Sequence, residues 1–495
     1  MNDSFLIDLV DSLTPVEAAE ASLADDPVKP AATVRYSSRG RLLVLGNHDA
    51  VDAVVDNLPT SLEVSVALAG PSRPDLSAKL SGEGVRLLNS LSGMDIFGWL
   101  GSFRLTATQN TDLEDLAPGA AFCESGFDLV LDLLEPPIAR RPNPPIGYFA
   151  AALSNPEKLE EALAQLPHWV GEFDKPNYYH FDPGLCDYRS GGVETCRRCF
   201  DVCGTWAITK DETRITVNPY LCQGCGDCAT VCPTGAISFN FPSPQRMLVR
   251  IERMLDAYFE HGGKVPVLLL HDGTKGRAWL GVHRDLLQVN VLPFEIEALG
   301  AVGAETWLMA LAFGAAEVLL LDTGGMNEKT RTLLRTQMEW CRAILAGLGF
   351  AQQVLRMVSA DEMRKASVPV HPFQPVEPLA IWPEHAGKRT LLREAIQHLR
   401  RQTSSPPLAL LPAGAPFGAV QIDPDACTLC MKCVPVCPET ALIGDPARKR
   451  LAFVEASCIQ CGGCVSICPE EAVTLQPRYT YDLDVIAAVR SLVQK

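Results

Sequence analysis

Residues 427–438 read CTLCMKCVPVCP, and residues 458–469 read CIQCGGCVSICP. Both stretches have the spacing C-x2-C-x2-C-x3-C-P, in which three cysteines hold one [4Fe–4S] cube and the fourth holds a second cube. Two intervening residues let a tight turn direct successive thiolates at one cube, and the proline leads the chain away from it. This spacing, present twice, indicates iron–sulfur ligation and disfavours the alternatives of zinc sites or disulfides.

A second cysteine block occupies residues 186–232. Its later half, CQGCGDCATVCP at 222–233, has the regular spacing. In the earlier half, nine residues separate Cys186 from Cys196, and Gly204 stands where proline is usual. We expect a loop insertion that keeps Cys186 as a ligand. The alternative is that Cys186 is structural, so that the cube is three-iron or takes a ligand from elsewhere.

If the ligands cross over in the usual way, sixteen of the eighteen cysteines hold four [4Fe–4S] clusters. Each set is named by the cysteine that is given first. The cysteine given last comes from the other half of the same block. The sets are Cys186, Cys196, Cys199 and Cys232; Cys222, Cys225, Cys228 and Cys203; Cys427, Cys430, Cys433 and Cys468; and Cys458, Cys461, Cys464 and Cys437. Cys123 and Cys341 have no neighbours at ligand spacing, so we expect them to be buried or inert.

The composition limits the classes of partner. The chain has 495 residues, of which 47% are hydrophobic and 21% are charged, which is typical of globular domains with real cores. The net charge of −16 argues against nucleic acid as a partner. An acidic surface suits basic patches on redox proteins, although it is equally typical of any well-dissolved protein.

The sequence also predicts a location. The N-terminal stretch MNDSFLIDLVDSL has no basic region and no long apolar core, so it does not read as a signal peptide. Arg-Arg pairs occur only internally, and no apolar run approaches the roughly 18 residues that span a bilayer. Thiolate ligands need a reducing compartment during assembly. We therefore expect a soluble, cytoplasmic protein.

Two regions outside the cysteine blocks have the pattern of parallel α/β domains. The strands predicted in the first region are 42–45, 62–68 and 127–133, and those in the second are 265–270, 287–291 and 318–321. Helices are predicted at 3–13, 49–58, 303–313, 328–348, 391–401 and 482–493, and another begins at Asn155-Pro156.

Cofactor binding by these α/β regions has little support in the motifs. The turn GNHDAV at 46–51 lacks the glycines of a dinucleotide site. In the second region the strand ends are followed by His271-Asp272-Gly273 and by DTGG at 322–325. Parallel sheets often bind flavin or nucleotides at this edge, but neither segment is a phosphate motif.

The cysteine blocks resemble bacterial two-cluster ferredoxins over about residues 180–240 and 419–476. The resemblance implies two small pseudo-symmetric modules of β-hairpins and short helices that transfer single electrons. We therefore expect an α+β and α/β multidomain protein with two ferredoxin-like modules and parallel-sheet domains. The expected divisions are 1–35 (helix and linker), 36–150 (α/β), 151–243 (first module with a leading helix), 244–366 (central α/β), 367–418 (Pro-rich linker with a helix) and 419–495 (second module with a C-terminal helix).

Two broader resemblances concern the rest of the chain. The central region is similar in architecture to the delta-subunit domain of methyl-viologen-reducing hydrogenase, without the cysteine ligands of that family. Three segments, VGEFDKPNYYHFDPGLC, NPYLCQGCGDCATVCPTGAISF and LPFEIEALGAVGAETWLMALAFGA, resemble iron–sulfur proteins encoded beside bacterial formate dehydrogenases. This second resemblance covers most of the chain from about residue 140 and implies a link to formate oxidation.

The function predicted from the sequence is electron transfer. No nucleophile, acid–base pair or open metal site stands out, so no catalytic residue is assigned. Four cubes in two pairs suit passing single electrons between a cytoplasmic oxidoreductase, such as formate dehydrogenase, and an acceptor. The alternatives are an iron–sulfur subunit of a flavin- or nucleotide-dependent oxidoreductase and a maturation factor for metalloenzymes.

Overall fold

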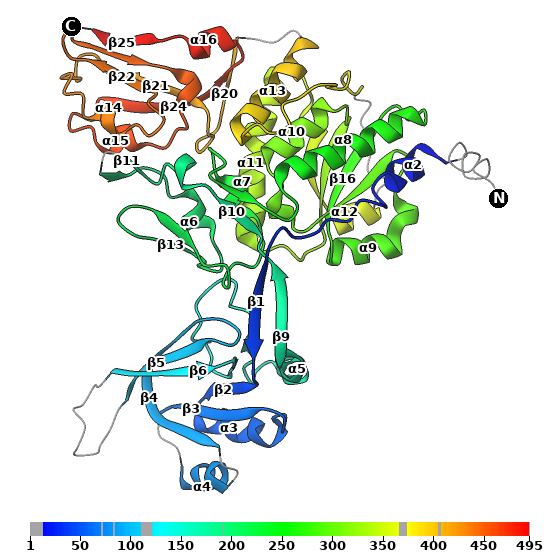
Figure 1. Ribbon diagram of the computed structural model, residues 1–495, viewed down its shortest axis with the longest axis vertical. Coiled ribbons are helices and arrows are strands. Elements are labelled where there is room, and N and C mark those ends of the chain that lie inside the picture. Colours follow the sequence, from blue (N-terminus) through cyan, green and yellow to red (C-terminus); the bar gives the residue numbers. More distant parts are fainter. Residues whose placement is uncertain are drawn as a thin grey trace.

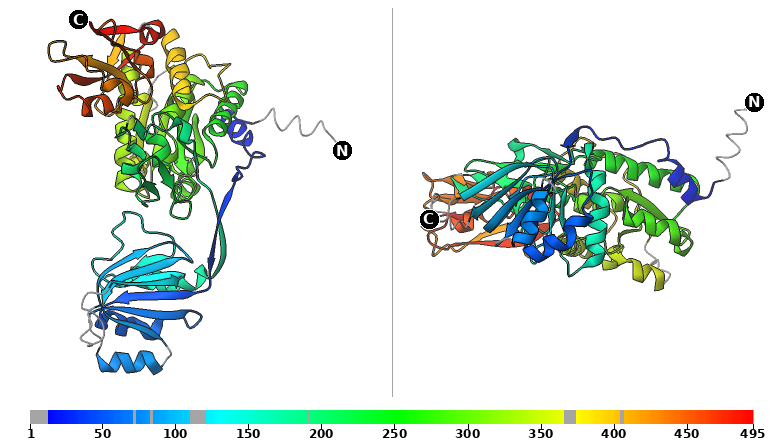
Figure 2. Two further views of the ribbon diagram at one scale, coloured as in Figure 1. Left: turned by 60° about the vertical axis from the view of Figure 1, so that its left-hand side comes forward. Right: turned by 90° about the horizontal axis from the view of Figure 1, so that it is seen from below.

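The computed structural model describes residues 13–70, 73–82, 85–109, 121–190, 192–365, 374–403 and 407–494. Figure 1 shows an N-terminal α/β domain at the bottom, a central α/β domain above it and the C-terminal module at the upper left. A two-stranded ribbon joins the N-terminal domain to the rest (Figure 2, left). The predicted mixed α/β multidomain architecture with parallel sheets is confirmed. Within the described residues, no helix has the length and hydropathy to cross a bilayer.

The N-terminal domain is built on a seven-stranded sheet in the order β6-β5-β4-β3-β2-β7-β8. Along β2 at its centre, Leu42 and Val44 pack into one core, and Leu43 and Leu45 pack into another. Both faces of β2 are covered, which is why it is a continuous apolar run. The elements are β2 (Arg41–Gly46), β3 (Glu63–Ala69), β4 (Arg86–Phe97), β5 (Phe103–Gln109), β6 (Ala121–Phe127), β7 (Leu129–Asp132) and β8 (Tyr148–Ala150), with helices α3 (His48–Val54), α4 (Pro74–Gly82) and α5 (Pro156–Gln165).

One half of this sheet is antiparallel, which the sequence pattern did not predict. Strand β4 pairs in parallel with β3 but antiparallel with β5, and β6 continues the antiparallel edge. The turn between β4 and β5 is tight. Gly98 has a φ of +111°, and a Cβ there would lie 2.1 Å from the carbonyl oxygen of Ser102, so only glycine fits.

A buried carboxylate, Asp128, binds the segment at which β2 begins. Asp128 is fully buried, and its Oδ1 accepts a hydrogen bond from Arg41 Nη2 at 2.6 Å, while its Oδ2 accepts one from the backbone N–H of Arg39 at 2.7 Å. Burial raises the pKa of Asp128, but the hydrogen bonds from Arg41 and Arg39 outweigh it and lower the pKa overall.

Replacing Asp128 with asparagine is expected to destabilise the N-terminal domain by about 2–3 kcal/mol near neutral pH, because Arg41 loses its charged partner. Since the folded-state pKa is lowered, this stabilisation is present above about pH 4 and is lost as the pH falls through the folded-state pKa. The stability of the variant should therefore decrease less than that of the wild type as the pH is lowered. Calorimetric unfolding at several pH values measures both effects. An unchanged unfolding transition of the N-terminal domain at neutral pH would contradict the prediction.

The ribbon between the domains pairs β1 (Thr33–Ser38) with β9 (Gly171–Pro176) in antiparallel register. Strand β1 begins at Thr33, so the end of the stretch 1–35, which was predicted as helix and linker, is part of this ribbon. Helix α5 begins as predicted, since Asn155 Oδ1 accepts from the Lys158 N–H at 3.1 Å. It does not lead the first cysteine module, however, because Ala162 on α5 and Leu166 just after it pack into the core around β2.

The central domain has a four-stranded parallel sheet in the order β17-β16-β18-β19. The strand predicted at 287–291 begins instead at Val291, because residues 284–286 form a 3₁₀ turn. The strands are β16 (Val267–Asp272), β17 (Val291–Ile296), β18 (Glu317–Asp322) and β19 (Leu355–Ser359). The helices are α8 (Pro244–Glu260), α9 (Lys275–His283), α10 (Ala304–Ala312), α11 (Glu328–Gly347), α12 (Ala360–Lys365) and α13 (Lys388–Arg401).

Helix α13 belongs to the core of this domain and does not sit in a linker. It packs against α10, which is buried on all sides, and its residues Leu391, Leu392 and Ile396 join the largest apolar cluster. This corrects the expectation of a Pro-rich linker at 367–418. The predicted helix at 3–13 lies, except for Leu13, outside the described residues. The first described helix, α2 (Pro15–Ala21), packs on α8.

The two cysteine modules are small and rich in hairpins. The first contains β10 (Tyr179–Phe181), β11 (Arg189–Ser190), β12 (Val193–Glu194), α6 (Arg198–Val202), β13 (Ile208–Lys210), β14 (Ile215–Val217), α7 (Asp227–Val231) and β15 (Ile237–Phe239). The second contains β20 (Leu408–Leu410), β21 (Gly418–Ile422), α14 (Cys433–Val436), β22 (Leu442–Asp445), β23 (Arg450–Phe453), α15 (Gly463–Ser466), β24 (Val473–Thr480), α16 (Leu483–Ala487) and β25 (Arg490–Gln494).

The predicted closing helix at 482–493 is wrong. Helix α16 ends at Ala487, and β25 then pairs antiparallel with β23. The reason is the buried carboxylate of Glu455, which is 5% exposed and accepts hydrogen bonds from Arg490 and, at 2.6 Å, from Arg478. An unpaired carboxylate there would be costly, so Arg490 is held against the sheet and the helical pattern is overridden.

Candidate metal centres

The Cys186 set lines one cavity of the first module. Cys186, Cys196, Cys199 and Cys232 all contribute to its wall. Between Cys186 and Cys196, Arg189–Ser190 (β11) pairs antiparallel with Val193–Glu194 (β12), which returns the chain toward its starting point. At its base the Thr195 N–H donates to the Tyr188 carbonyl at 2.9 Å. The insertion therefore leaves Cys186 beside the other three cysteines.

Gly204 lies against the N-terminal domain. The Asn143 N–H donates to the Gly204 carbonyl at 3.2 Å, and a Cβ at Gly204 would lie 3.0 Å from Asn143 Nδ2. A larger residue here would require the Asn143 side chain, in the connection from β7 to β8, to shift.

The Cys222 set is partly buried, and Cys225 lies between the first module and the central domain. Burial raises the pKa of Cys225, and the negative charges of Asp227, Cys222 and Cys203 add to the shift. Cys203 is therefore within electrostatic reach of its predicted set. Gly226 has a φ of +81°, and a Cβ there would lie 2.3 Å from Ala301 Cα, so the central domain can approach only because this residue is glycine.

The second module brings its two sets to two separate cavities. Cys427, Cys430, Cys433 and Cys468 line one, and Cys437, Cys458, Cys461 and Cys464 line the other. The fourth cysteine of each half thus lies with the other half, as the crossover predicts. Cys430 is the one exposed member among the described cysteines.

The thiol chemistry fits a metal cluster. Burial raises the pKa of Cys433 to about 11 and that of Cys464 to about 12, and neighbouring thiolates contribute to both shifts. Such thiols keep their protons at neutral pH unless a cation replaces them. None of the described cysteines is in a disulfide. Among the described side chains, no three His, Cys, Asp or Glu stand close enough for a single metal ion, whereas a cubane accepts ligands that are farther apart.

The two remaining cysteines are not in these sets. Cys341 on α11 is completely buried in the core of the central domain, and burial raises its pKa strongly. Cys123 lies on β6 in a stretch whose side chains are outside the described part. The structure thus agrees with the prediction that Cys341 is buried.

Several groups donate to the cysteine sulfurs, and the motif search missed them. Gln460 Nε2 lies 3.2 Å from Cys458 Sγ, and the Ala441 N–H donates to Cys437 Sγ at 3.2 Å. In the first module Thr205 Oγ1 lies 3.5 Å from Cys203 Sγ, and Thr234 Oγ1 lies 3.6 Å from Cys232 Sγ. The repeated threonine two residues after the last cysteine of each half was the available sequence signal.

Replacing Gln460 with methionine is expected to lower the reduction potential of one cluster, because hydrogen bonds to sulfur favour the more negative, reduced state. The shift should be roughly 40 mV for each kcal/mol of hydrogen-bond energy lost. A redox titration followed by EPR measures it. Gln421→Met, at an exposed position of β21, is the matched control, and an unchanged or raised potential in the Gln460 variant would contradict the prediction.

The two modules meet through the loops of the Cys186 and Cys458 sets. Arg198 donates to the Gly414 carbonyl at 3.1 Å and to the Gln460 carbonyl at 3.3 Å. A Cβ at Gly463 would lie 2.8 Å from Thr195 Cγ2. Burial and the nearby Glu439 of the second module raise the pKa of Asp187 in the first.

Helix α13 holds both modules with adjacent residues. Lys388 Nζ donates to the Ala229 and Thr230 carbonyls of α7, both at 2.8 Å. Arg389 is turned to the second module, where it donates to the Ala456 carbonyl at 3.2 Å and to the Cys458 carbonyl at 3.0 Å. The central domain thereby fixes the position of one module relative to the other.

Comparisons with known proteins agree with this picture. Residues 419–469 match the 4Fe-4S dicluster domain family, and residues 215–238 match the 4Fe-4S binding domain family. Over 69 residues the chain is 38% identical to the arsenate respiratory reductase iron-sulfur subunit ArrB of Shewanella sp. (strain ANA-3). That stretch spans 14% of this chain and 27% of the relative. The chain therefore contains 4Fe-4S ferredoxin-type domains with 4Fe-4S-binding cysteine motifs.

Proposed function

We propose that the protein carries four [4Fe–4S] clusters in a single line and passes electrons one at a time between a redox partner and an acceptor. The observation that carries this proposal is the contact between the loops of the Cys186 and Cys458 sets. Burial raises the pKa of Cys196, and the negative charge of Cys461 in the other module contributes to the shift. Two clusters of different modules are then neighbours, as electron tunnelling over short distances requires.

The order of the clusters follows from which set has which neighbour. The Cys186 and Cys458 cubes form the middle of the line. The Cys427 cube is the outer end in the second module, where exposed Cys430 gives a partner protein access. The Cys222 cube is the other end, and it lies against the central domain. The sequence Cys427, Cys458, Cys186, Cys222 is therefore the proposed path in either direction.

All sixteen motif cysteines act as ligands in this proposal, including Cys186. The shared cavity of the Cys186 set supports its ligand role over a purely structural one. Bound cubes supply one-electron redox chemistry, with potentials set by charge, exposure and hydrogen bonds to sulfur. The chain's own residues hold the thiolates in place, exclude water and donate to the sulfurs.

The partner we propose is a cytoplasmic oxidoreductase, with formate dehydrogenase as the first candidate. The resemblance of three segments to iron–sulfur proteins encoded beside formate dehydrogenases supports this choice. The likeness to ArrB, named as the iron-sulfur subunit of a respiratory reductase, supports a role as one subunit of a larger redox complex. Both resemblances are consistent with a chain that works together with a separate catalytic subunit.

The cluster order is tested by EPR of anaerobically purified, reduced protein. In a background without the Cys222 cube (Cys222→Ser with Cys225→Ser), the Cys186 cube has one neighbour left. Removing the Cys458 cube (Cys461→Ser with Cys464→Ser) should abolish the magnetic coupling in the EPR signal of the Cys186 cube. Removing the Cys427 cube (Cys427→Ser with Cys430→Ser) should leave the coupling intact. Equal effects of the two removals would refute the order.

The partner is tested separately by mixing the oxidised protein with formate and formate dehydrogenase. Reduction of the clusters is expected only when enzyme and substrate are both present. It is measured as the bleaching of their visible absorption. If the clusters stay oxidised while dithionite reduces them, the formate dehydrogenase assignment is wrong, but the electron-transfer function is unaffected.

A further inference from the structure

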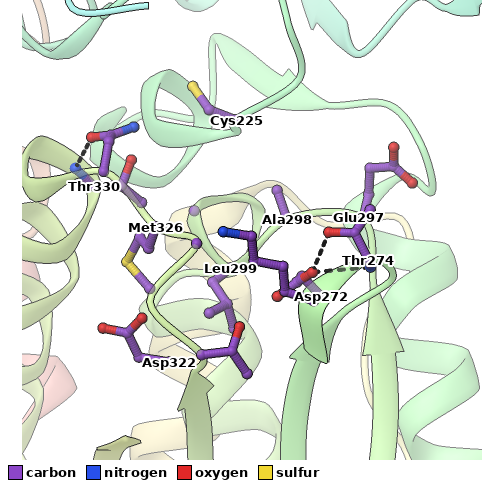
Figure 3. Close-up of a pocket in the computed structure, with 14 residues that line it drawn as sticks. Cys225, Asp272, Thr274, Glu297, Ala298, Leu299, Asp322, Met326 and Thr330 are labelled. Atoms are coloured by element: carbon purple, nitrogen blue, oxygen red, sulfur yellow. Dashed lines mark hydrogen bonds between the residues drawn. The ribbon is translucent and has the colours of Figure 1, made fainter. Parts of the chain in front are cut away.

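A cavity of about 230 Å³ lies at the carboxyl edge of the central sheet, beside the Cys222 set. The loops after β16, β17 and β18 form three of its walls, and Cys225 of the first module lies on the fourth (Figure 3). The chain passes from β16 to β17 on one side and then crosses back over β16 to β18 on the other, so the strand order reverses beside β16. Open α/β sheets bind ligands at such a switch point.

The carboxylates of the cavity are already engaged by the protein. Asp272 Oδ1 accepts from the Thr274 N–H at 2.9 Å (Figure 3), and its Oδ2 accepts from the Gly276 N–H at 3.2 Å. Asp322 Oδ1 accepts from the Gly324 N–H at 2.9 Å, and its Oδ2 accepts from Arg331 Nε at 2.8 Å. These two acids cap loops and helices, so they offer little to a cation.

Glu297 is the remaining carboxylate on the wall. Its Oε1 accepts from the Tyr178 hydroxyl at 3.3 Å, and burial raises its pKa. It lies after β17, on a different loop from the turn that precedes α11.

The donors of the cavity are not engaged. Lys275 lines it, and its ammonium has no hydrogen bond or ion pair with any described residue. The hydroxyl of Thr323 is buried and without a partner in the described chain. Within the same part of the chain, the backbone N–H groups of Gly325 and Met326 also make no hydrogen bond. Free donors beside saturated acceptors select an anion.

We propose that this cavity binds the oxyanion group, phosphate or carboxylate, of a small molecule, with Lys275 as its main contact. The volume is below the roughly 300–1,000 Å³ of drug-sized sites, which points to a small ligand or to one end of a larger one. The adjoining turn leads into α11, whose positive end adds to the attraction.

The position of Cys225 couples this site to the proposed electron path. In Figure 3 the sulfur of Cys225 points away from the cavity, so a single residue separates a bound anion from the Cys222 cube. A negative charge at that place should make the cube harder to reduce. This second statement rests on the proposed function, whereas binding itself does not.

The test is calorimetric titration of the anaerobic holoprotein with inorganic phosphate, succinate and AMP as probes. Phosphate and AMP binding without succinate binding would assign a phosphate ligand, and the converse would assign a carboxylate. Lys275→Ala should weaken the binding by about tenfold or more. Lys264→Ala is the matched control, because that lysine precedes β16 and lies at the opposite edge of the sheet.

A second variant fills the space without removing charge. Ala298→Phe places a ring on the cavity wall and should block binding while the iron content stays unchanged. In parallel, EPR redox titration should show a probe-dependent fall in the potential of one cluster in the wild type and none in Lys275→Ala. No binding by any probe, or equal binding by the Lys275 and Lys264 variants, overturns the site. Binding that leaves all potentials unchanged overturns only the coupling.

Discussion

A protein with Cys186 replaced by serine is expected to contain about twelve irons instead of about sixteen, four for each cube. Cys186 lies in one cavity with Cys196, Cys199 and Cys232, and serine is a far poorer ligand for iron than a thiolate. Because small modules have little core beyond their clusters, the first module should also become less stable. Iron determination and thermal unfolding under anaerobic conditions measure both effects.

The control for this substitution is Cys341→Ala. Cys341 is likewise outside any disulfide, but it is fully buried in the apolar core of the central domain, whereas Cys186 is partly exposed. It should keep about sixteen irons. If Cys186→Ser also keeps them, Cys186 is structural. A product with about fifteen irons and the EPR signal of an oxidised three-iron cluster would show that the variant cube persists without this ligand.

Replacing Arg389 with methionine is expected to detach the second module from the rest. Arg389 is partly buried, which lowers its pKa to about 10, and it packs 4.9 Å from the Phe417 ring centroid. Its loss leaves the carbonyls of Pro416 and Cys458 without a donor, whereas the Ala456 carbonyl keeps Arg393. We expect a cost of about 2–4 kcal/mol, since each unsatisfied buried acceptor costs about 1–3 kcal/mol and partial rehydration recovers some of it.

The measurable results are a lower melting temperature for the second module and loss of magnetic coupling between the Cys186 and Cys458 cubes. Arg401→Met is the matched control, because Arg401 lies on the same helix but is exposed. The clusters of the first module should be retained, since Lys388 still holds α7. A coupled spectrum identical to that of the wild type would show that the module contact does not depend on α13.

The two modules differ in ways that suit their positions. The first has the β11–β12 insertion, Gly204 in place of proline and central-domain residues against Gly226. The second keeps the regular motif and presents Cys430 at the surface. In the proposed path, the Cys186 set of the first module is thus an internal position with other domains packed around it. The Cys427 set of the second module is the exposed end.

The sequence was informative wherever the chemistry is local. Cysteines three residues apart reach one cluster through a single turn, so spacing predicted the four sets before any fold was known. The same holds for Asn155, which caps the helix it precedes, and for the apolar runs of β16 and β18, which can be buried only in a covered parallel sheet.

Tertiary structure decided what depends on residues far apart in the chain. The carboxylate of Glu455 turned the predicted closing helix into β25, and the core around β2 took α5 from the first module. The facing of the Cys186 and Cys458 sets and the cavity beside Cys225 depend on how α13 and the strand ends meet the modules. Sequence by itself predicted which thiolates can hold iron, because the cysteine spacing within each half is a recognisable local pattern. Tertiary structure decided which cysteine sets face each other, because that depends on contacts between modules that no local pattern encodes.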